Sequence, residues 1–257
     1  MGIFKDYVNK LENCTIQPLP VNHIANIKSI EEFFSKNKIS NDYLVDKCEV
    51  FNEHYLYIFY GRAAFRLNKP DAYPICFVFK KPDLDPVKVF PFDSGAFYHK
   101  RMAEYFNIEL TLDDFDFGGN NDYIYRIVKH FFEDNTGYYD EKTKSISVEE
   151  DIPAIKGYLN MIAAENNDRL DGRKSAIELI YDFPFDLNKG LELVIIPELD
   201  LKISTGKMSF EDIKAKLETS YNCQVTSYPN KMIDPIDSSY KDIKKIVRSY
   251  IKNNGGL

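Results

Sequence analysis

Short runs of β-branched and aromatic residues, set between segments of helical periodicity, constrain the fold of this chain more than any other feature. Such runs occupy 55–60, 74–80, 87–92, 175–181 and 191–196. Each is too short to be a long buried helix, and glycine, proline or charged residues flank it. The pattern predicts a sheet of short, mostly buried strands.

Apolar residues at helical spacing predict helices between these runs. One begins near residue 26 or 28 and ends at Ser35, with Asn26 as its N-cap. A second follows the turn at 91–95. Others are expected over 122–133, 152–165 and 239–252, and one more starts at Ser209, where Asp212 completes a capping box.

The order of these segments predicts the domain organisation. The chain has 257 residues, of which 44% are hydrophobic, enough for a substantial core. No internal repeat or Gly/Ser linker divides it. We therefore expect a single α+β domain over 1–257, with a central mixed or antiparallel sheet flanked by helices. Residues 209–257 could form a helical C-terminal extension.

Charge and cysteine content exclude several classes of protein. Lys and Arg total 33 against 40 Asp and Glu, a net charge of -7, so no broad basic field attracts nucleic acid. Charged residues interrupt the N-terminal segment, and no apolar run approaches the roughly 18–20 residues of a membrane span. The four cysteines are isolated, which predicts reduced thiols and no zinc site. A cytoplasmic protein without a membrane partner is expected.

Glu178 is the strongest candidate for chemistry, because it interrupts the apolar run 175–181. Side chains alternate along a strand, so Glu178 shares a face with Ala176 and Ile180. An unpaired buried carboxylate costs several kcal/mol. Glu178 is therefore either an edge-strand charge that points to solvent or an active-site carboxylate.

A dense aromatic run that leads into two arginines is the second candidate. Tyr57 and Tyr60 precede Gly61, and Arg62 and Arg66 follow it. Two guanidinium groups at a strand end can bind a phosphate or carboxylate, and the tyrosines offer stacking surfaces. The alternative is a core strand whose arginines pair with acidic residues.

His23 lies in an extended segment before the first helix, and Asn26 follows it by three positions. A neutral imidazole can donate to and accept from a ribose hydroxyl. The alternative is a structural or exposed histidine.

Together, these three segments resemble the ADP-ribosyltransferase fold, most closely the bacterial toxins that transfer ADP-ribose from NAD to nucleic acid. The similarity lies in His-Ile-Ala-Asn at 23–26, in the aromatic segment 51–66, and in the Arg-Lys-Ser-Ala-Ile-Glu run that ends at Glu178. It spans about 21–197. Ala176 stands where relatives that modify arginine carry a paired Glu or Gln, which argues against that activity.

The resemblance implies a chemical role for each candidate. Glu178 would stabilise the oxocarbenium ion formed when nicotinamide leaves, or orient the acceptor, and Arg62 would assist catalysis or hold the pyrophosphate. NAD would be a substrate, and no metal would be needed. The implied NAD-binding residues are His23, Asn26, Tyr57, Tyr60 and Arg66.

A stripe of basic residues on the last predicted helix could bind a nucleic-acid acceptor. Its members are Lys241, Lys244, Lys245 and Arg248. The alternative is the solvated face of an amphipathic helix.

The leading hypothesis is an NAD-dependent ADP-ribosyltransferase, a bacterial toxin or antiphage defence effector restrained by an antitoxin or another defence protein. Simple NAD hydrolysis is a close variant. A non-enzymatic sensor or adaptor that binds a partner through the aromatic run 55–65 is the alternative from another class. A metal-dependent nuclease built on Asp114 and Asp116 is a weaker one, because the spacing of this acidic loop fits no EF-hand template.

Overall fold

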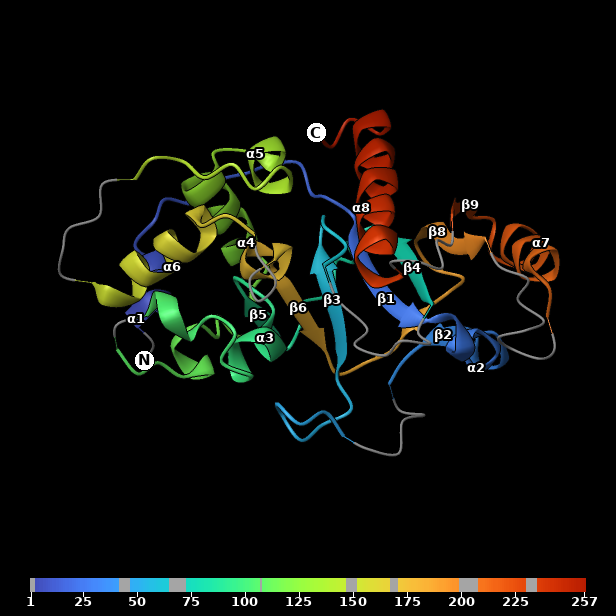
Figure 1. The fold of residues 1–257 in the computed structure, drawn as a ribbon, viewed down its shortest axis with the longest axis horizontal. Coiled ribbons are helices and arrows are strands. Elements are labelled where there is room, and N and C mark those ends of the chain that lie inside the picture. The colour runs from blue at the N-terminus through green and yellow to red at the C-terminus, as the bar shows by residue number, and fades with distance from the viewer. Residues whose placement is uncertain are drawn as a thin grey trace.

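The computed structural model describes residues 3–41, 47–64, 73–106, 108–146, 152–166, 171–198, 208–229 and 235–257. It confirms the predicted α+β class, with a central mixed sheet flanked by helices (Figure 1). The main sheet has seven strands in the order β5-β6-β3-β1-β4-β8-β9. Their bounds are β1 Val21–Asn26, β3 Leu56–Tyr60, β4 Pro74–Phe79, β5 Lys88–Phe90, β6 Glu178–Tyr181, β8 Leu191–Glu198 and β9 Gln224–Pro229.

Neighbouring strands of the main sheet are antiparallel except for one pair. Only β8 and β9 run parallel, at the edge of the sheet. A separate two-stranded ladder joins β2 (Lys38–Ile39) to β7 (Phe185–Asp186). The sheet is therefore assembled from pairings between segments far apart in sequence.

The strand β1 at the centre of the sheet is the main departure from the sequence prediction, which expected only an extended approach to the first helix. All its residues from Val21 to Ala25 are buried, and it pairs with β3 on one side and β4 on the other. Its sequence contains Asn22, His23 and Asn26, so it lacks the apolar run that marked β4.

Helices surround the sheet. They are α1 (Ile3–Asn9), α2 (Ile30–Lys36), α3 (Ser94–Tyr98), α4 (Asp122–Ile127), α5 (Asn135–Tyr139), α6 (Pro153–Ala163), α7 (Phe210–Tyr221) and α8 (Pro235–Asn253). Short 3-10 turns are η1 (Ile27–Ser29), η2 (Ala103–Tyr105), η3 (Leu112–Asp114) and η5 (Gly172–Ser175), and a π-helical turn, η4 (Val128–Phe132), follows α4.

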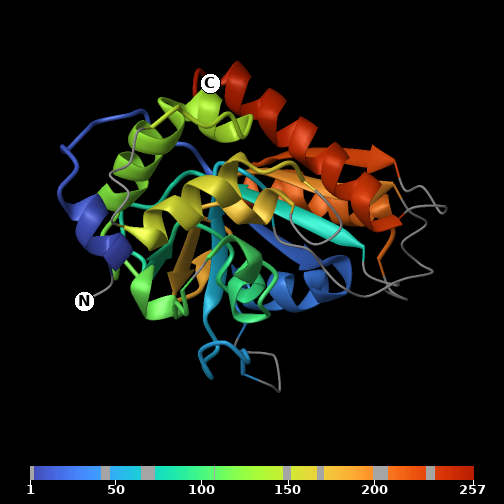
Figure 2. The same ribbon diagram turned by 60° about the vertical axis from the view of Figure 1, so that its left-hand side comes forward.

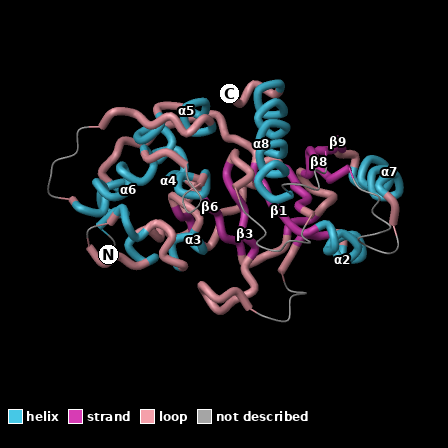
Figure 3. The backbone as a smooth tube through the Cα atoms, viewed as in Figure 1, coloured by secondary structure: helices cyan, strands magenta, loops and turns pink. Residues whose placement is uncertain are grey.

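The sheet lies between α8 on one side and α2 on the other (Figure 2). The α8 helix packs against β4 and β9. On the opposite side, Phe33 of α2 meets Phe77 of β4 edge to face, with ring centroids 5.8 Å apart. Figure 3 shows α4, α5 and α6 gathered at the β6 end of the sheet, away from α7. The sheet is thus covered on both faces, which explains its nearly continuous apolar strands.

An aromatic cluster joins the helices at the β5 and β6 end. Phe4 of α1 contacts Phe115, Phe131 and Tyr158, at centroid distances of 5.1, 5.9 and 4.8 Å. Phe92 meets Phe115 at 4.8 Å. The phenyl and phenol rings of this chain, which has no Trp, therefore fill much of this half of the core.

Several predicted element boundaries are confirmed by their capping bonds. The Asn26 side chain accepts from the Lys28 N–H, and Ser209 and Asp212 form the expected capping box. One expectation was wrong in detail. The predicted strand 175–181 begins only at Glu178, because η5 precedes it.

Residues after 208 contribute both strand and helix. The α7 helix leads into β9, which lies beside β8 at the edge of the main sheet, and α8 then returns across β4. Within the described ranges, no helix combines the length and the apolar character needed to cross a bilayer.

Candidate functional site

The three segments that carry the family resemblance lie on adjacent strands. In the register of the sheet, Asn22 of β1 pairs with Phe59 of β3, and Phe59 pairs with Glu178 of β6. Phe90 of β5 continues the same row beside Glu178. Directly opposed residues point to the same side of a sheet. Asn22, Phe59, Glu178 and Phe90 therefore define one face, called here the Glu178 face.

Glu178 is buried, with 2% of its surface exposed. Its Oε2 accepts a hydrogen bond of 3.0 Å from the backbone N–H of Ser94, the first residue of α3. Next to Ser94, Asp93 caps α3 by accepting from the Ala96 N–H at 2.7 Å. No lysine or arginine of the described ranges forms an ion pair with Glu178. Because Asp93 directly precedes Ser94, the hydrogen bond from Ser94 places the buried carboxyl of Asp93 close to Glu178.

The protonation of the two carboxyls follows from this environment. Burial raises the pKa of Glu178 well above its ordinary value, and the charge of Asp93 raises it further, against the backbone hydrogen bond from Ser94. Burial likewise raises the pKa of Asp93, while the Ala96 N–H and Arg173 oppose the rise. Arg173 itself is held by a two-pronged ion pair with Asp171. The carboxyl pair therefore retains a proton to higher pH than an isolated carboxyl does.

Two buried hydroxyls near Glu178 have no hydrogen-bond partner within the described part of the chain. Tyr57 lies two positions before Phe59 and so belongs to the Glu178 face. Burial raises the pKa of its phenol, and nearby Cys48 and Glu178 add to the rise. The hydroxyl oxygens of Tyr57 and Ser94 are both buried and unpartnered. Both can donate to a ligand that reaches Glu178.

The structure does not bring His23 and Glu178 to the same face. His23 follows Asn22 in β1 and pairs with Phe77, so its side chain points to the opposite side of the sheet. Its Nδ1 donates to the Tyr57 carbonyl at 3.0 Å. Burial lowers the pKa of His23 to about 4, although this hydrogen bond opposes the shift. His23 is therefore a neutral, buried residue that holds the backbone of β3 at Tyr57.

Two further predicted cofactor residues have structural partners. The Tyr60 hydroxyl accepts from the Leu19 N–H at 3.0 Å, and its ring is fully buried. The Asn26 side chain accepts from the Lys28 N–H at 3.2 Å as the cap of η1. Tyr57 is thus the one of the two predicted tyrosines that shares a face with Glu178. Arg66 lies outside the described residues.

Arg62 belongs to a buried ionic network, called here the Arg62 network. Its Nη1 donates to Glu141 Oε1 at 2.8 Å, and its Nη2 donates to Ser175 Oγ at 2.8 Å. The guanidinium lies 4.7 Å from the centre of the Tyr138 ring. Lys244 of α8 adds a second cation to the same Glu141 oxygen, also at 2.8 Å. Only 2% of the Arg62 side chain is exposed, so its guanidinium is not accessible to bind a pyrophosphate in this structure.

The Arg62 network keeps its carboxylate ionised. Burial raises the pKa of Glu141, but the opposing effect of Arg62 and Lys244, with hydrogen bonds from Lys244 and Asn166, brings it to about 2. Glu141 therefore carries its charge throughout the physiological range.

The basic stripe of α8 is partly neutralised within the chain. Lys244 binds Glu141, and Arg248 donates to both oxygens of Asp140 at 2.9 Å. Lys245 Nζ lies 3.9 Å from Oδ1 of Asp242, which is one turn earlier in the helix, and Lys241 is exposed. Two of the four predicted nucleic-acid contacts thus tie α8 to α5 and the residues after it.

The remaining sequence candidates have other partners. Asp114 caps η3, and Asp116 binds Lys88. Among the described residues, no group of three His, Cys, Asp or Glu side chains could hold a metal ion. The aromatic run that the binding-module alternative required as a surface is mostly interior, because Leu56, Ile58, Phe59 and Tyr60 are buried strand residues.

Two residues of this site were not identified from the sequence. Asp93 caps α3 at the turn where a helix was expected to begin, but its proximity to Glu178 depends on the pairing of β5 with β6. Asn22 donates to the Gly61 carbonyl at 2.8 Å and leaves its own buried Oδ1 unpartnered on the Glu178 face. The polar Asn-His pair inside a strand was the available signal for Asn22.

Comparison with known proteins adds no relative to this description. No protein family, no curated protein and no solved structure matches the chain. The functional assignment therefore depends on the chemistry around Glu178 and on the sequence resemblance described above.

Proposed function

We propose that the protein is an NAD-dependent ADP-ribosyltransferase that uses Glu178, with nucleic acid as the favoured acceptor and water as the variant acceptor. One observation carries the proposal. Glu178 is a buried carboxyl, next to a second buried carboxyl, and no cation of the described residues compensates it. Such an arrangement costs folding free energy, so a functional reason for keeping it is expected.

A positively charged ligand would supply the missing compensation. The nicotinamide ring of NAD is a pyridinium cation, and its positive charge passes to the ribose as the glycosidic bond breaks. A carboxyl that is reluctant to ionise in the empty site becomes a better anion beside that charge. The site therefore favours the transition state of glycosidic cleavage over the empty state.

The proposed reaction has a simple balance. The electron pair of the bond between ribose C1′ and the nicotinamide nitrogen leaves with neutral nicotinamide. Glu178 stabilises the resulting oxocarbenium ion, and a nucleophilic nitrogen or oxygen of the acceptor then bonds to C1′ and loses a proton. The hydroxyls of Tyr57 and Ser94 would donate to the ribose or to the nicotinamide amide.

In this proposal, His23 and Arg62 are positioning residues. His23 fixes the Tyr57 backbone through its 3.0 Å hydrogen bond. Arg62 holds Ser175, three residues before Glu178, against Glu141. Both act through the residues they hold, which accounts for their presence in the resembling segments without contact to NAD.

The biological setting is proposed on the resemblance alone. A cytoplasmic toxin or antiphage defence effector that consumes NAD needs a restraining partner, such as an antitoxin. Regulation of this kind would be tested after the activity itself.

The deciding experiment compares wild-type protein with Glu178→Gln and with the control Glu218→Gln, which makes the same chemical change on the exposed side of α7. Each is incubated with NAD, with and without DNA, RNA or cell lysate. Released nicotinamide and the mass of each acceptor are measured. We expect Glu178→Gln to reduce nicotinamide release by about 100-fold or more, and Glu218→Gln to leave it unchanged.

Each result decides between the alternatives. Glu178-dependent release with a mass gain on an acceptor supports transfer, and release without a mass gain supports NAD hydrolysis. Equal release by wild type and Glu178→Gln, or no release under any condition, would overturn the proposal.

A further inference from the structure

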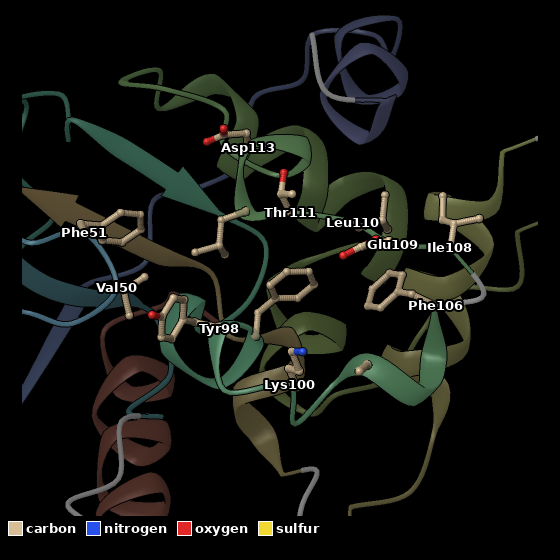
Figure 4. Close-up of a pocket in the computed structure, with 13 residues that line it drawn as sticks. Val50, Phe51, Tyr98, Lys100, Phe106, Ile108, Glu109, Leu110, Thr111 and Asp113 are labelled. Atoms are coloured by element: carbon tan, nitrogen blue, oxygen red, sulfur yellow. The ribbon is translucent and has the colours of Figure 1, made fainter.

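A cavity of about 730 Å³ lies beside α3, which contributes Phe97 and Tyr98 to its lining. Three segments line it: the loop before β3, the α3–η2 region and residues 108–113 (Figure 4). Its volume is in the range of pockets that hold small organic ligands. None of the residues so far assigned to the NAD reaction lines it.

Aromatic rings form the walls of this cavity, called here the α3 pocket. Phe51 stacks on Phe90 with centroids 5.8 Å apart, and Phe97 stacks on Phe92 at 5.1 Å. Phe106 meets Phe97 edge to face at 5.9 Å. These ring contacts hold Phe51, Phe97 and Phe106 in position around the cavity that they line. Fixed aromatic walls favour a planar ring as the ligand.

The mouth of the α3 pocket exposes apolar surface that the fold itself does not cover. Among the described residues, three large hydrophobic side chains are strongly exposed, and two of them, Tyr98 at 44% and Ile108 at 37%, line this pocket. Apolar surface concentrated at one concave site is typical of a binding site.

Three charged residues line the α3 pocket, and Figure 4 shows one of them, Asp113, on the opposite side of the cavity from Lys100. The other two, the oppositely charged Lys100 and Glu109, lie nearer to Phe106 in that view. Neither forms an ion pair with another part of the described chain. Lys100 also has a φ of 56°, a left-handed conformation that is uncommon for lysine. The ligand should therefore carry an anionic group and a hydrogen-bond donor in addition to its ring.

We propose that the α3 pocket binds a nucleotide whose base carries an exocyclic amino group, such as cytosine or adenine. The base stacks between the aromatic walls, the amino group donates to the Glu109 carboxylate, and the phosphate lies toward Lys100. A nucleotide combines all three chemical features in one molecule. This inference goes beyond the proposed NAD reaction and does not rest on it.

The chemistry of the base edge makes the proposal specific. Cytosine presents an N4 amino donor where uracil presents an O4 acceptor. An ionised Glu109 accepts from the first and repels the second. A free nucleotide and an unpaired base of a nucleic-acid strand share this chemistry, so both are possible sources of the ligand.

The test measures binding by titration calorimetry, without NAD and in the Glu178→Gln protein, so that its result is independent of NAD turnover. The ligands are CMP, UMP and cytidine. We expect CMP to bind about tenfold more tightly than UMP. Glu109→Gln, whose amide can donate to O4, should abolish this preference, and Lys100→Met should make CMP bind no better than cytidine.

Matched controls separate these effects from general changes in charge. Glu104→Gln and Lys129→Met alter exposed residues that do not line the pocket, and both should bind CMP as the parent protein does. Ala103→Trp fills the cavity from an exposed position and should abolish binding while the protein remains folded by circular dichroism.

The source of the base is resolved by a further arm with a short oligocytidylate. Tighter binding of the oligonucleotide than of CMP assigns the pocket to a strand, whereas tighter binding of CMP assigns it to a free nucleotide, and either result supports the proposal. Equal affinity for CMP and UMP, no binding at millimolar ligand, or CMP binding that survives Ala103→Trp would overturn it.

Discussion

The Arg62 network and the carboxyl pair around Glu178 are both buried charge clusters, yet their composition is opposite. In the first, Glu141 receives two cations and an amide, and Arg62 finds partners for both terminal nitrogens. In the second, Glu178 receives one backbone N–H and lies beside another carboxyl. The carboxylate of the first cluster is paired with cations, whereas in the second the nearby Arg173 acts on Asp93 and Glu178 has no ion pair among the described residues.

The difference appears in the pKa values of the two glutamates. Burial acts on both in the same direction, but the cations around Glu141 reverse its effect and bring the pKa to about 2. Around Glu178, the neighbouring charge has the same sign and the pKa rises. Burial alone therefore does not single out a candidate carboxylate, whereas burial without a compensating cation makes Glu178 the candidate for the proposed reaction.

The comparison predicts its largest effect at Arg62. Arg62→Met leaves Glu141 facing one exposed cation and removes the partner of Ser175, so we expect a loss of about 3–5 kcal/mol in the free energy of unfolding. Denaturant unfolding measures this loss. Arg248→Met is the matched control, because the Arg248 side chain that pairs with Asp140 is 40% exposed and the pair should contribute about 1 kcal/mol or less. Similar losses in the two variants would contradict the distinction.

A somewhat smaller effect is expected from the titration of Glu141. Its folded-state pKa lies below its unfolded value, so its contribution is complete above about pH 4.3 and is lost as the pH falls toward 2. Lowering the pKa of Glu141 to about 2 on folding contributes about 3 kcal/mol to the free energy of unfolding at neutral pH. Glu141→Gln should lack this component, and the difference between the two unfolding free energies should shrink on acidification. A difference independent of pH would contradict this assignment.

The strands of the main sheet show how far the sequence could predict the fold. The β3, β4 and β8 strands were predictable because each consists mainly of apolar residues, most of them buried. The β1 strand was not, since its polar residues looked like a loop. In the fold, Asn22 and His23 bond to the backbone carbonyls of Gly61 and Tyr57, which makes them compatible with a central strand.

The candidate site was predictable only in part, for a related reason. Glu178 was identifiable because a single carboxylate interrupts an apolar strand. Its hydrogen bond from Ser94 joins residues 84 positions apart, and Arg62 meets Glu141 across 79 positions. Local patterns do not encode such pairings. As a result, the sequence left open whether Arg62 binds a ligand or pairs with an acidic residue, and the fold shows the pairing, with Glu141.

The smallest predicted effect is at Glu178 itself, and it has the opposite sign. Because the folded-state pKa lies above the unfolded value, the unfolded chain releases its proton first, and stability falls as the pH rises from about 4.3 toward the folded pKa. Glu178→Gln should remove this loss, so at pH 7 the variant should be more stable than wild type by about 1 kcal/mol or more. Unfolding curves from pH 4 to 8 measure the difference, which should widen with pH. A variant that is less stable at pH 7 would mean that Glu178 is compensated in the fold, and the argument for a ligand cation at this carboxyl pair would lose its basis.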